Sequence, residues 1–116
     1  DIAVLDCSAE THLPDVLAMP YRPHLINSGK PDELPHTFRL GGISCLAGDI
    51  IGDYSFSEPL RPGQRLVFTD MALYSFVKNS TFNGVELPSI YTCRASDNSL
   101  SLIRTFGYED YRSRIA

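Results

Sequence analysis

The sequence lacks three features that would each point to a class of protein. No run of like charge occurs, and 10 basic against 14 acidic residues give a net charge of -4, which argues against nucleic acid or an anionic membrane as a partner. No stretch approaches the roughly 20 consecutive apolar residues of a membrane-spanning helix. The N-terminus has no basic segment followed by an apolar stretch, so we expect no secretion signal there.

Cysteines are few and unpaired. The three, Cys7, Cys45 and Cys93, are an odd number without a CxxC pair, which argues against a disulfide framework and against a zinc site. Reduced thiols in a cytoplasmic protein fit this pattern better. Cys7 and Cys93 lie in strand-like segments, where we expect them to be small buried side chains.

Long helical periodicity is also nearly absent, and short β-rich segments separated by Gly and Pro dominate the 116 residues. Short helices are expected near Pro14 and near Glu109, where acidic residues precede basic ones. With 43% hydrophobic residues the chain can form one core but not two. The pattern therefore predicts a mainly β domain over residues 1–116, a barrel or a sandwich, with short helices. The expected strands are residues 2–7, 36–40, 64–69, 73–78, 89–94 and 100–106.

Four turns and loops have recognisable chemistry. Pro62-Gly63 predicts a tight reversal, and Asn83-Gly84 tolerates positive φ. Asp97-Asn98-Ser99 predicts a hairpin loop between the last two strands. Residues 27–35, rich in Gly, Pro and acidic residues, are expected to form an exposed loop.

Two clusters of unusual residues stand out. In residues 39–49 a predicted strand runs into a glycine-rich loop that holds a thiol and a carboxylate, and such a loop lets the backbone approach a ligand closely. Residues 69–84 mix polar and aromatic side chains over a span that should be core strand and turn. Taken alone the glycine-rich loop is a weak signal, because turns of this kind are common.

Together these segments resemble the C-terminal domain of the fold-type III decarboxylases, a group that includes the ornithine, diaminopimelate and carboxynorspermidine enzymes. Four motifs carry the resemblance: Gly-x-x-Cys-x-x-x-Asp at 42–49, Pro-Leu-x-x-Gly-x-x-Leu-x-Phe at 59–68, Asp-Met-Ala-x-Tyr at 70–74 and Thr-Phe-Asn-Gly at 81–84. Within the group, residues 12–17, 19–23, 45–49, 52–56 and 104–111 are similar to the carboxynorspermidine (carboxyspermidine) decarboxylase family.

The resemblance implies a pyridoxal-phosphate enzyme that acts as a homodimer on a carboxylated polyamine. Each subunit of the family pairs a cofactor-binding (β/α)8 barrel with a C-terminal β-barrel domain, and the active sites lie at the dimer interface. The resemblance therefore implies that residues 1–116 form a Greek-key-like β-barrel. The Schiff-base lysine belongs to the (β/α)8 barrel, and neither Lys30 nor Lys78 lies in similar surroundings. We therefore expect the (β/α)8 barrel to be absent from this chain and the chain alone to be inactive.

The resemblance also suggests roles for five residues. Cys45 would be the catalytic proton donor, reaching across the dimer interface, and Tyr74 would contact the cofactor phosphate. Asp49, His12 and Asp15 would lie near the substrate. The plain alternatives are a buried loop cysteine, a core tyrosine, a loop-capping aspartate, a surface histidine and a helix-capping aspartate.

Three positions depart from the family pattern. Leu46 stands where ornithine-type enzymes carry an aspartate that grips the distal amine, which argues against an ornithine or diaminopimelate enzyme. Leu73 and Ala18 stand where a histidine and an acid are expected, so substrate preference could differ. The alternative from another class is a β-barrel binding module without catalysis. The choice between carboxynorspermidine and carboxyspermidine stays open.

Overall fold

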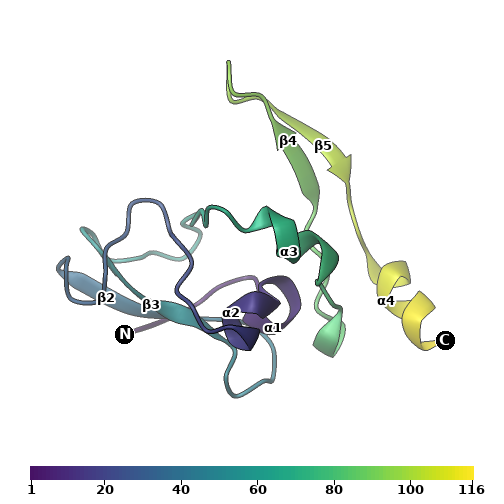
Figure 1. Ribbon diagram of the computed structural model, residues 1–116, viewed down its shortest axis with the longest axis horizontal. Helices are drawn as coiled ribbons and strands as arrows, with labels where there is room; N and C mark the ends of the chain where they lie inside the picture. Colours follow the sequence, from purple (N-terminus) through teal and green to yellow (C-terminus); the bar gives the residue numbers. More distant parts are fainter.

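Short strands and short helices alternate along the chain (Figure 1). The computed structural model describes residues 1–72 and 74–116 in full, and residue 73 only as part of a helix, so that the side chain of Leu73 lies outside the described residues. The longest helix has eight residues, which agrees with the predicted class of sheets with short helices. The elements are β1 (Ile2–Val4), α1 (Ala9–His12), α2 (Pro14–Ala18), β2 (His36–Gly41), β3 (Ile50–Phe56), α3 (Ala72–Val77), the 3₁₀ turn η1 (Phe82–Gly84), β4 (Ile90–Cys93), β5 (Leu100–Arg104) and α4 (Tyr108–Ile115).

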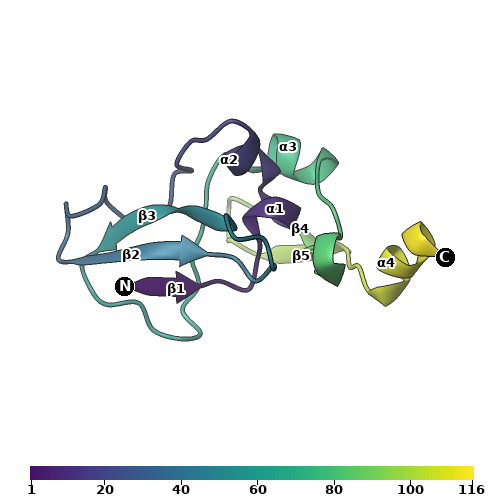
Figure 2. The same ribbon diagram turned by 90° about the horizontal axis from the view of Figure 1, so that it is seen from below.

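The first three strands form one sheet, in which β1 is parallel and β3 antiparallel to the central strand β2. Leu40 is fully buried while its neighbour Arg39 is exposed, as the alternation in the sequence predicts. Helix α1 lies at one end of this sheet (Figure 2). Each large apolar side chain that the core buries fully contributes about 1.5–3 kcal/mol. The buried core consists of Ala9, Leu25, Leu40, Ile51, Tyr54 and Phe56.

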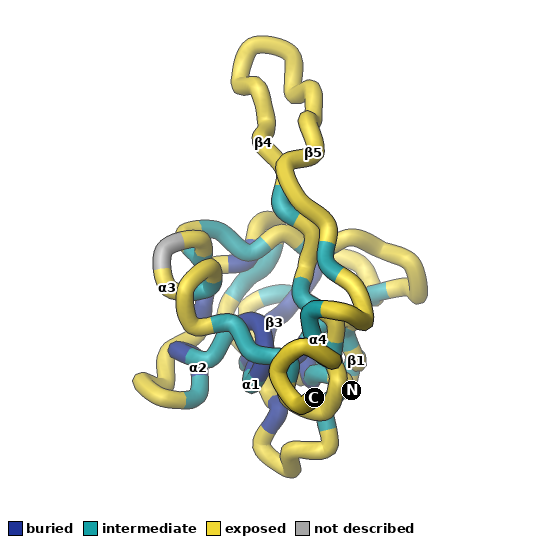
Figure 3. Tube along the Cα trace, turned by 90° about the vertical axis from the view of Figure 1, so that its right-hand side faces the viewer, coloured by how far each residue is buried: buried dark blue, intermediate teal, exposed yellow. Residues whose placement is uncertain are grey.

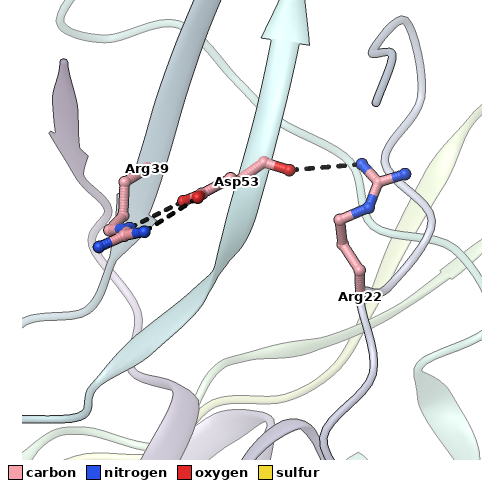
Figure 4. Close-up of polar contacts among 3 residues, drawn as sticks. All are labelled: Arg22, Arg39 and Asp53. Atoms are coloured by element: carbon pink, nitrogen blue, oxygen red, sulfur yellow. Dashed lines mark hydrogen bonds and ion pairs between the residues drawn. The ribbon is translucent and has the colours of Figure 1, made fainter. Parts of the chain in front are cut away.

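On the exposed face of the sheet, a pair of opposite charges joins β2 to β3. Arg39 lies opposite Asp53 in the register, and its Nε and Nη2 donate to the two carboxylate oxygens at 2.8 and 3.0 Å (Figure 4). Arg22 adds a longer contact of 3.5 Å to the Asp53 carbonyl. The hydrogen bond from Arg39 lowers the pKa of Asp53, with the positive charge of the guanidinium adding to the effect. This two-pronged contact favours one register of the strand pair.

The C-terminal part of the chain extends away from the sheet. Hairpin β4–β5 and helix α4 project outward, and the whole of β5 is exposed (Figures 1 and 3). Leu100, Leu102 and Ile103 on β5 are each more than half exposed. The radius of gyration is 15.2 Å, whereas a compact domain of this length has about 13 Å. An isolated two-stranded hairpin is only marginally stable in water. Because hairpin β4–β5 also leaves its apolar side chains exposed, we expect it to be unstable without further contacts.

Several predicted elements are confirmed. Helix α2 begins at Pro14, and α4 has two acidic residues in its first turn and two arginines in its last. Strands β2, β4 and β5 lie within or close to their predicted bounds. In the predicted hairpin loop Asn98 has a φ of 56°, and in the other two turns Gly63, Asn83 and Gly84 also have positive φ. Local turn chemistry decides these features, so the sequence is enough to predict them.

Two predicted strands are wrong. Residues 73–77 belong to helix α3 and Lys78 caps its C-terminal end; both the amide and the hydroxyl of Ser75 donate to the Met71 carbonyl. Residues 64–69 form no regular strand; a single bridge joins Phe68 to Leu25. Within the described residues the two sheets are separate and open, so the predicted closed barrel is not found there.

Strand β3 is a missed element. Its Ile51, Tyr54, Ser55 and Phe56 are buried, so the sequence does not alternate as a half-exposed strand would. Ser55 is buried because the loop of residues 27–35 folds over it: Gly29 pairs with Ser55, whose hydroxyl also contacts the Lys30 carbonyl and the Leu34 amide. That loop is otherwise largely exposed, as predicted.

Cys93 corrects another expectation. It lies on the projecting hairpin and is exposed, because no other part of the described chain covers β4. Cys7 is partly buried and packs against the core, close to the prediction. None of the described helices is both long and apolar enough to cross a bilayer.

We expect Tyr54→Phe to destabilise the fold. The Tyr54 hydroxyl donates to the carbonyl of buried Pro23 at 2.6 Å. Without it the carbonyl loses its partner, which should lower the free energy of unfolding by about 1–3 kcal/mol. Urea unfolding of the variant beside the wild type measures this loss. A variant as stable as the wild type would contradict the role given to this hydrogen bond.

The same tyrosine should make the protein sensitive to alkali. Burial raises the pKa of Tyr54 to about 12, although the Arg22 guanidinium over its ring opposes the rise. Since an unfolded tyrosine has a pKa of about 10, the folded state favours the neutral phenol, and its stabilisation is present below about pH 10 and lost as the pH rises toward 12. Between about pH 8 and 11 the wild type should therefore lose more stability than Tyr54→Phe.

Candidate functional site

The glycine-rich loop joins β2 to β3 beside helix α1 (Figure 2). Gly42 opens the loop, and a Cβ at this position would lie 2.5 Å from both carboxylate oxygens of Asp49. The Gly42 amide also donates to the Asp49 carbonyl at 2.8 Å. Only glycine permits this close approach, so the loop closes on itself with Cys45 and Leu46 at its outer side.

The Asp49 carboxylate fastens this loop to α1. Asp49 is 5% exposed, and its oxygens accept from the Ser8 hydroxyl at 2.9 Å and the Ala9 amide at 2.6 Å. They also accept from the amide and hydroxyl of Ser44, at 3.0 and 2.5 Å. Burial opposes ionisation, but these hydrogen bonds together hold the pKa of Asp49 below its usual value. A substrate amine would have to displace one of these donors to reach the carboxylate.

His12 joins α1 to the segment before β4. It is 8% exposed; its Nδ1 accepts from the Ser8 amide at 3.2 Å, and its Nε2 lies 2.9 Å from the Glu86 carbonyl. Because an amide can only donate and a carbonyl can only accept, the ring carries its proton on Nε2 in this arrangement. Both ring nitrogens are thereby engaged within the chain.

Cys45 lies at the exposed side of the loop, next to the turn η1. Its amide donates to the Asn83 side-chain Oδ1 at 2.7 Å. Phe82, just before Asn83, is 41% exposed. Sequence reasoning identified Asn83 only as a turn residue and missed its contact with Cys45. The Thr-Phe-Asn-Gly motif was the signal in the sequence that could have suggested it.

Asp15 and Tyr74 form a second group, between α2 and α3. Lys78 Nζ lies 2.6 Å from Asp15 Oδ1 and 4.9 Å from the centre of the Tyr74 ring. Asp15 is buried, whereas Tyr74 is 51% exposed. Asp15, Tyr74, Tyr21 and Asp70 share the lining of a cavity of about 180 Å³. The five predicted site residues thus fall into two groups: Cys45, Asp49 and His12 around α1, and Asp15 with Tyr74 at α2 and α3.

A larger groove, of about 930 Å³, runs between β1 and residues 60–68. Ile2 and Val4 of β1 line it and are 72% and 68% exposed. Cys7 also faces it; burial and then the nearby charges of Asp6 and Asp49 raise the pKa of this thiol to about 11. Cys7 is therefore a much weaker acid than an ordinary thiol.

Comparison with known proteins gives close relatives. The chain is 52% identical over 113 residues to carboxyaminopropylagmatine decarboxylase of Synechocystis, covering 97% of this chain and 29% of that protein. It is 39% identical to the carboxynorspermidine/carboxyspermidine decarboxylase of Campylobacter jejuni, covering 97% of this chain and 32% of the relative. The enzyme of the same name from Herminiimonas arsenicoxydans is 37% identical, with 100% and 30% covered. No family model matches the chain.

Solved structures agree with these relatives. The crystal structure of carboxynorspermidine decarboxylase complexed with norspermidine, from Campylobacter jejuni, superposes with a TM-score of 0.90 at 39% identity, over 97% of this chain and 34% of that one. Lysine decarboxylase from Selenomonas ruminantium shares the fold, with a TM-score of 0.60 over 74% of this chain and 23% of its own, at 23% identity. The resemblance predicted from the motifs is thus confirmed: over nearly its whole length, the chain corresponds to a region of carboxynorspermidine/carboxyspermidine-type decarboxylases that makes up about a third of those enzymes.

Proposed function

We propose that this chain is the C-terminal region of a pyridoxal-phosphate-dependent decarboxylase of carboxylated polyamines, and that Cys45 donates the proton that replaces the lost CO2. The observation that carries the proposal is the placement of Cys45: it is exposed, on a loop that Asp49 fastens on one side and Asn83 contacts on the other. An exposed thiol on a fixed loop can reach a reacting atom outside this chain.

For the proton transfer, this chain needs only to place the Cys45 thiol close to the reacting carbon. When bound, pyridoxal phosphate supplies the electron sink that makes loss of CO2 feasible. The Cys45 thiol then gives its proton to the substrate carbon that carried the carboxylate, and the thiolate is reprotonated before the next turnover. Leu46 is 37% exposed beside it, and an apolar side chain there helps to exclude water from the reacting carbon.

Tyr74 fits a role in holding the cofactor. A phosphate needs hydrogen-bond donors and positive charge, and Tyr74 offers an exposed phenol with the Lys78 ammonium beside its ring. Asp15 pairs with Lys78 and so fixes the cation next to Tyr74. A direct contact between Asp15 and substrate stays a prediction. For Asp49 and His12 the contacts within the chain support a positioning role, and their predicted substrate contacts also stay predictions.

The remaining two thirds of the polypeptide would supply what this chain does not. We infer that it contains the (β/α)8 barrel with the cofactor lysine, and that its strands close the open sheet into a barrel by covering β1, where Ile2 and Val4 are exposed along the large groove. A homodimer in the cytoplasm is part of the same proposal. It would place Cys45 of one subunit in the partner's active site.

Carboxylated polyamines fit the relatives as a substrate class, since all three named enzymes act on molecules of this kind by name. Carboxynorspermidine and carboxyspermidine are the substrates that the motifs suggest. Carboxyaminopropylagmatine is a further candidate substrate. The identity of 52% to the enzyme named for it, against 39% and 37% for the other two enzymes, favours it over both carboxylated triamines.

Cys45→Ala in the full-length enzyme should bind cofactor and substrate but turn over slowly. Loss of a positioned proton donor lowers kcat by about 100-fold or more. A fraction of the substrate should leave as an aldehyde, because the proton is then delivered to the cofactor carbon and hydrolysis leaves the amino group on the cofactor as its pyridoxamine form. Mass spectrometry of the products measures that fraction. Normal turnover and normal product would remove the donor role.

The cross-subunit position of Cys45 can be tested by mixing subunits. Neither Cys45→Ala homodimers nor homodimers lacking the cofactor lysine should be active at the wild-type rate. Heterodimers of the two should regain activity, because one of their sites receives both the thiol and the lysine. No recovery on mixing would show that Cys45 serves its own subunit.

Substrate preference can be measured directly. The full-length enzyme should decarboxylate carboxyaminopropylagmatine, carboxynorspermidine and carboxyspermidine, with the highest kcat/KM for the first. Release of CO2 from each compound, under identical conditions, gives the three values. A higher kcat/KM for either triamine would reverse the order without changing the substrate class, and activity toward none of them would remove the class itself.

A further inference from the structure

The side chain of Asn83 makes the contact that fixes the Cys45 end of the loop. Asn83 has φ 63° and ψ 13°, in the left-handed region, and Gly84 follows with φ 70°. Among residues with a side chain, Asn and Asp adopt this conformation most readily. The left-handed turn points the Asn83 amide group at the loop, where its Oδ1 accepts from the Cys45 amide at 2.7 Å.

The segment that carries Asn83 is itself anchored on α1. The Ser80 amide donates to the Thr11 carbonyl at 3.0 Å on one side of the turn, and His12 bonds the Glu86 carbonyl at 2.9 Å on the other. Asn83 is therefore held between two fixed points. Because Asp49 fastens the opposite end of the glycine-rich loop to the same helix, α1 is the common support of both contacts that bracket Cys45.

The contact matters because, among the described hydrogen bonds, it is the one that Cys45 itself makes. The residues on either side are held to Asp49 instead: the Ser44 amide donates to Asp49 Oδ2 and the Leu46 carbonyl accepts from the Asp49 amide, both at 3.0 Å. Without the Asn83 oxygen, the Cys45 backbone can move outward. A misplacement of about 1 Å can cost a proton transfer up to about 100-fold in rate.

We propose that Asn83 is a positioning residue, which holds the Cys45 thiol at the distance that proton transfer requires through its hydrogen bond to the Cys45 amide. This inference rests on the proposed role of Cys45 as proton donor. In this role Asn83 contacts neither the substrate nor the cofactor, and it affects the reaction only by positioning Cys45.

Two substitutions in the full-length enzyme distinguish the effect of the Asn83 side-chain oxygen from the effect of the left-handed backbone at this position. Asn83→Gly keeps the left-handed backbone and removes the acceptor, whereas Asn83→Asp keeps both an acceptor oxygen and tolerance of positive φ. Asn98→Gly is the matched control, since Asn98 has φ 56° in the hairpin loop between β4 and β5, away from Cys45. Cofactor absorbance and melting temperature report whether each variant is folded.

Asn83→Gly should lower kcat by about 10- to 100-fold and raise the aldehyde fraction, with KM changed less than about twofold. Asn83→Asp should return the aldehyde fraction toward the wild-type value, and Asn98→Gly should match the wild type. In a Cys45→Ala background, Asn83→Gly should add no further loss, because the donor it positions is already gone. Hydrogen exchange of the Cys45 amide should be faster in Asn83→Gly than in the wild type.

The outcomes distinguish this inference from the function on which it rests. A normal Cys45→Ala enzyme would overturn both. A defective Cys45→Ala enzyme beside a normal Asn83→Gly enzyme would overturn the role of Asn83 alone. The same holds if Asn83→Gly slows the Cys45→Ala enzyme further, or if folded Asn83→Asp produces as much aldehyde as Asn83→Gly.

Discussion

The hydrogen bonds to the buried carboxylate of Asp49 are the interactions on which the rest of the candidate site depends. A buried charge is costly unless hydrogen bonds satisfy it, and here donors from Ser8, Ala9 and Ser44 do so. These donors come from the start of α1 and from the glycine-rich loop. The carboxylate therefore sets the path of the loop, and Gly42 is the residue that lets the loop pass so close to it.

Helix α1 is only four residues long, yet it supports both halves of the site. Its first turn holds the loop with Cys45, and its last two residues, Thr11 and His12, hold the segment with Asn83. A second set of contacts, between Asp15, Lys78 and Tyr74, joins α2 to α3. The two groups of predicted site residues are thus built on adjacent helices but through separate contacts.

Exposed apolar side chains gather at two places in the fold. Ile2 and Val4 on β1 and three apolar residues on β5 are more than half exposed, and the hairpin and α4 extend outward (Figure 3). The two strands belong to separate sheets. The chain spans about a third of the relatives it matches.

The sequence alone determined the features that depend on local chemistry: β2 from its alternation, α2 from Pro14, α4 from its charges and the hairpin loop from Asp97-Asn98-Ser99. Its motifs also indicated the resemblance to carboxynorspermidine/carboxyspermidine-type decarboxylases, whereas the role of Cys45 stays a prediction. Tertiary structure decided the rest. β3 was missed because the loop of residues 27–35 buries Ser55. Residues 72–77 form a helix, which carries Tyr74 and leads into Lys78, the partner of Asp15. Asn83 meets Cys45 across 38 positions of sequence, and Asp49 meets Ser8 across 41, because α1 brings these segments together. The local sequence pattern cannot predict such contacts, because they join segments that are distant in the sequence.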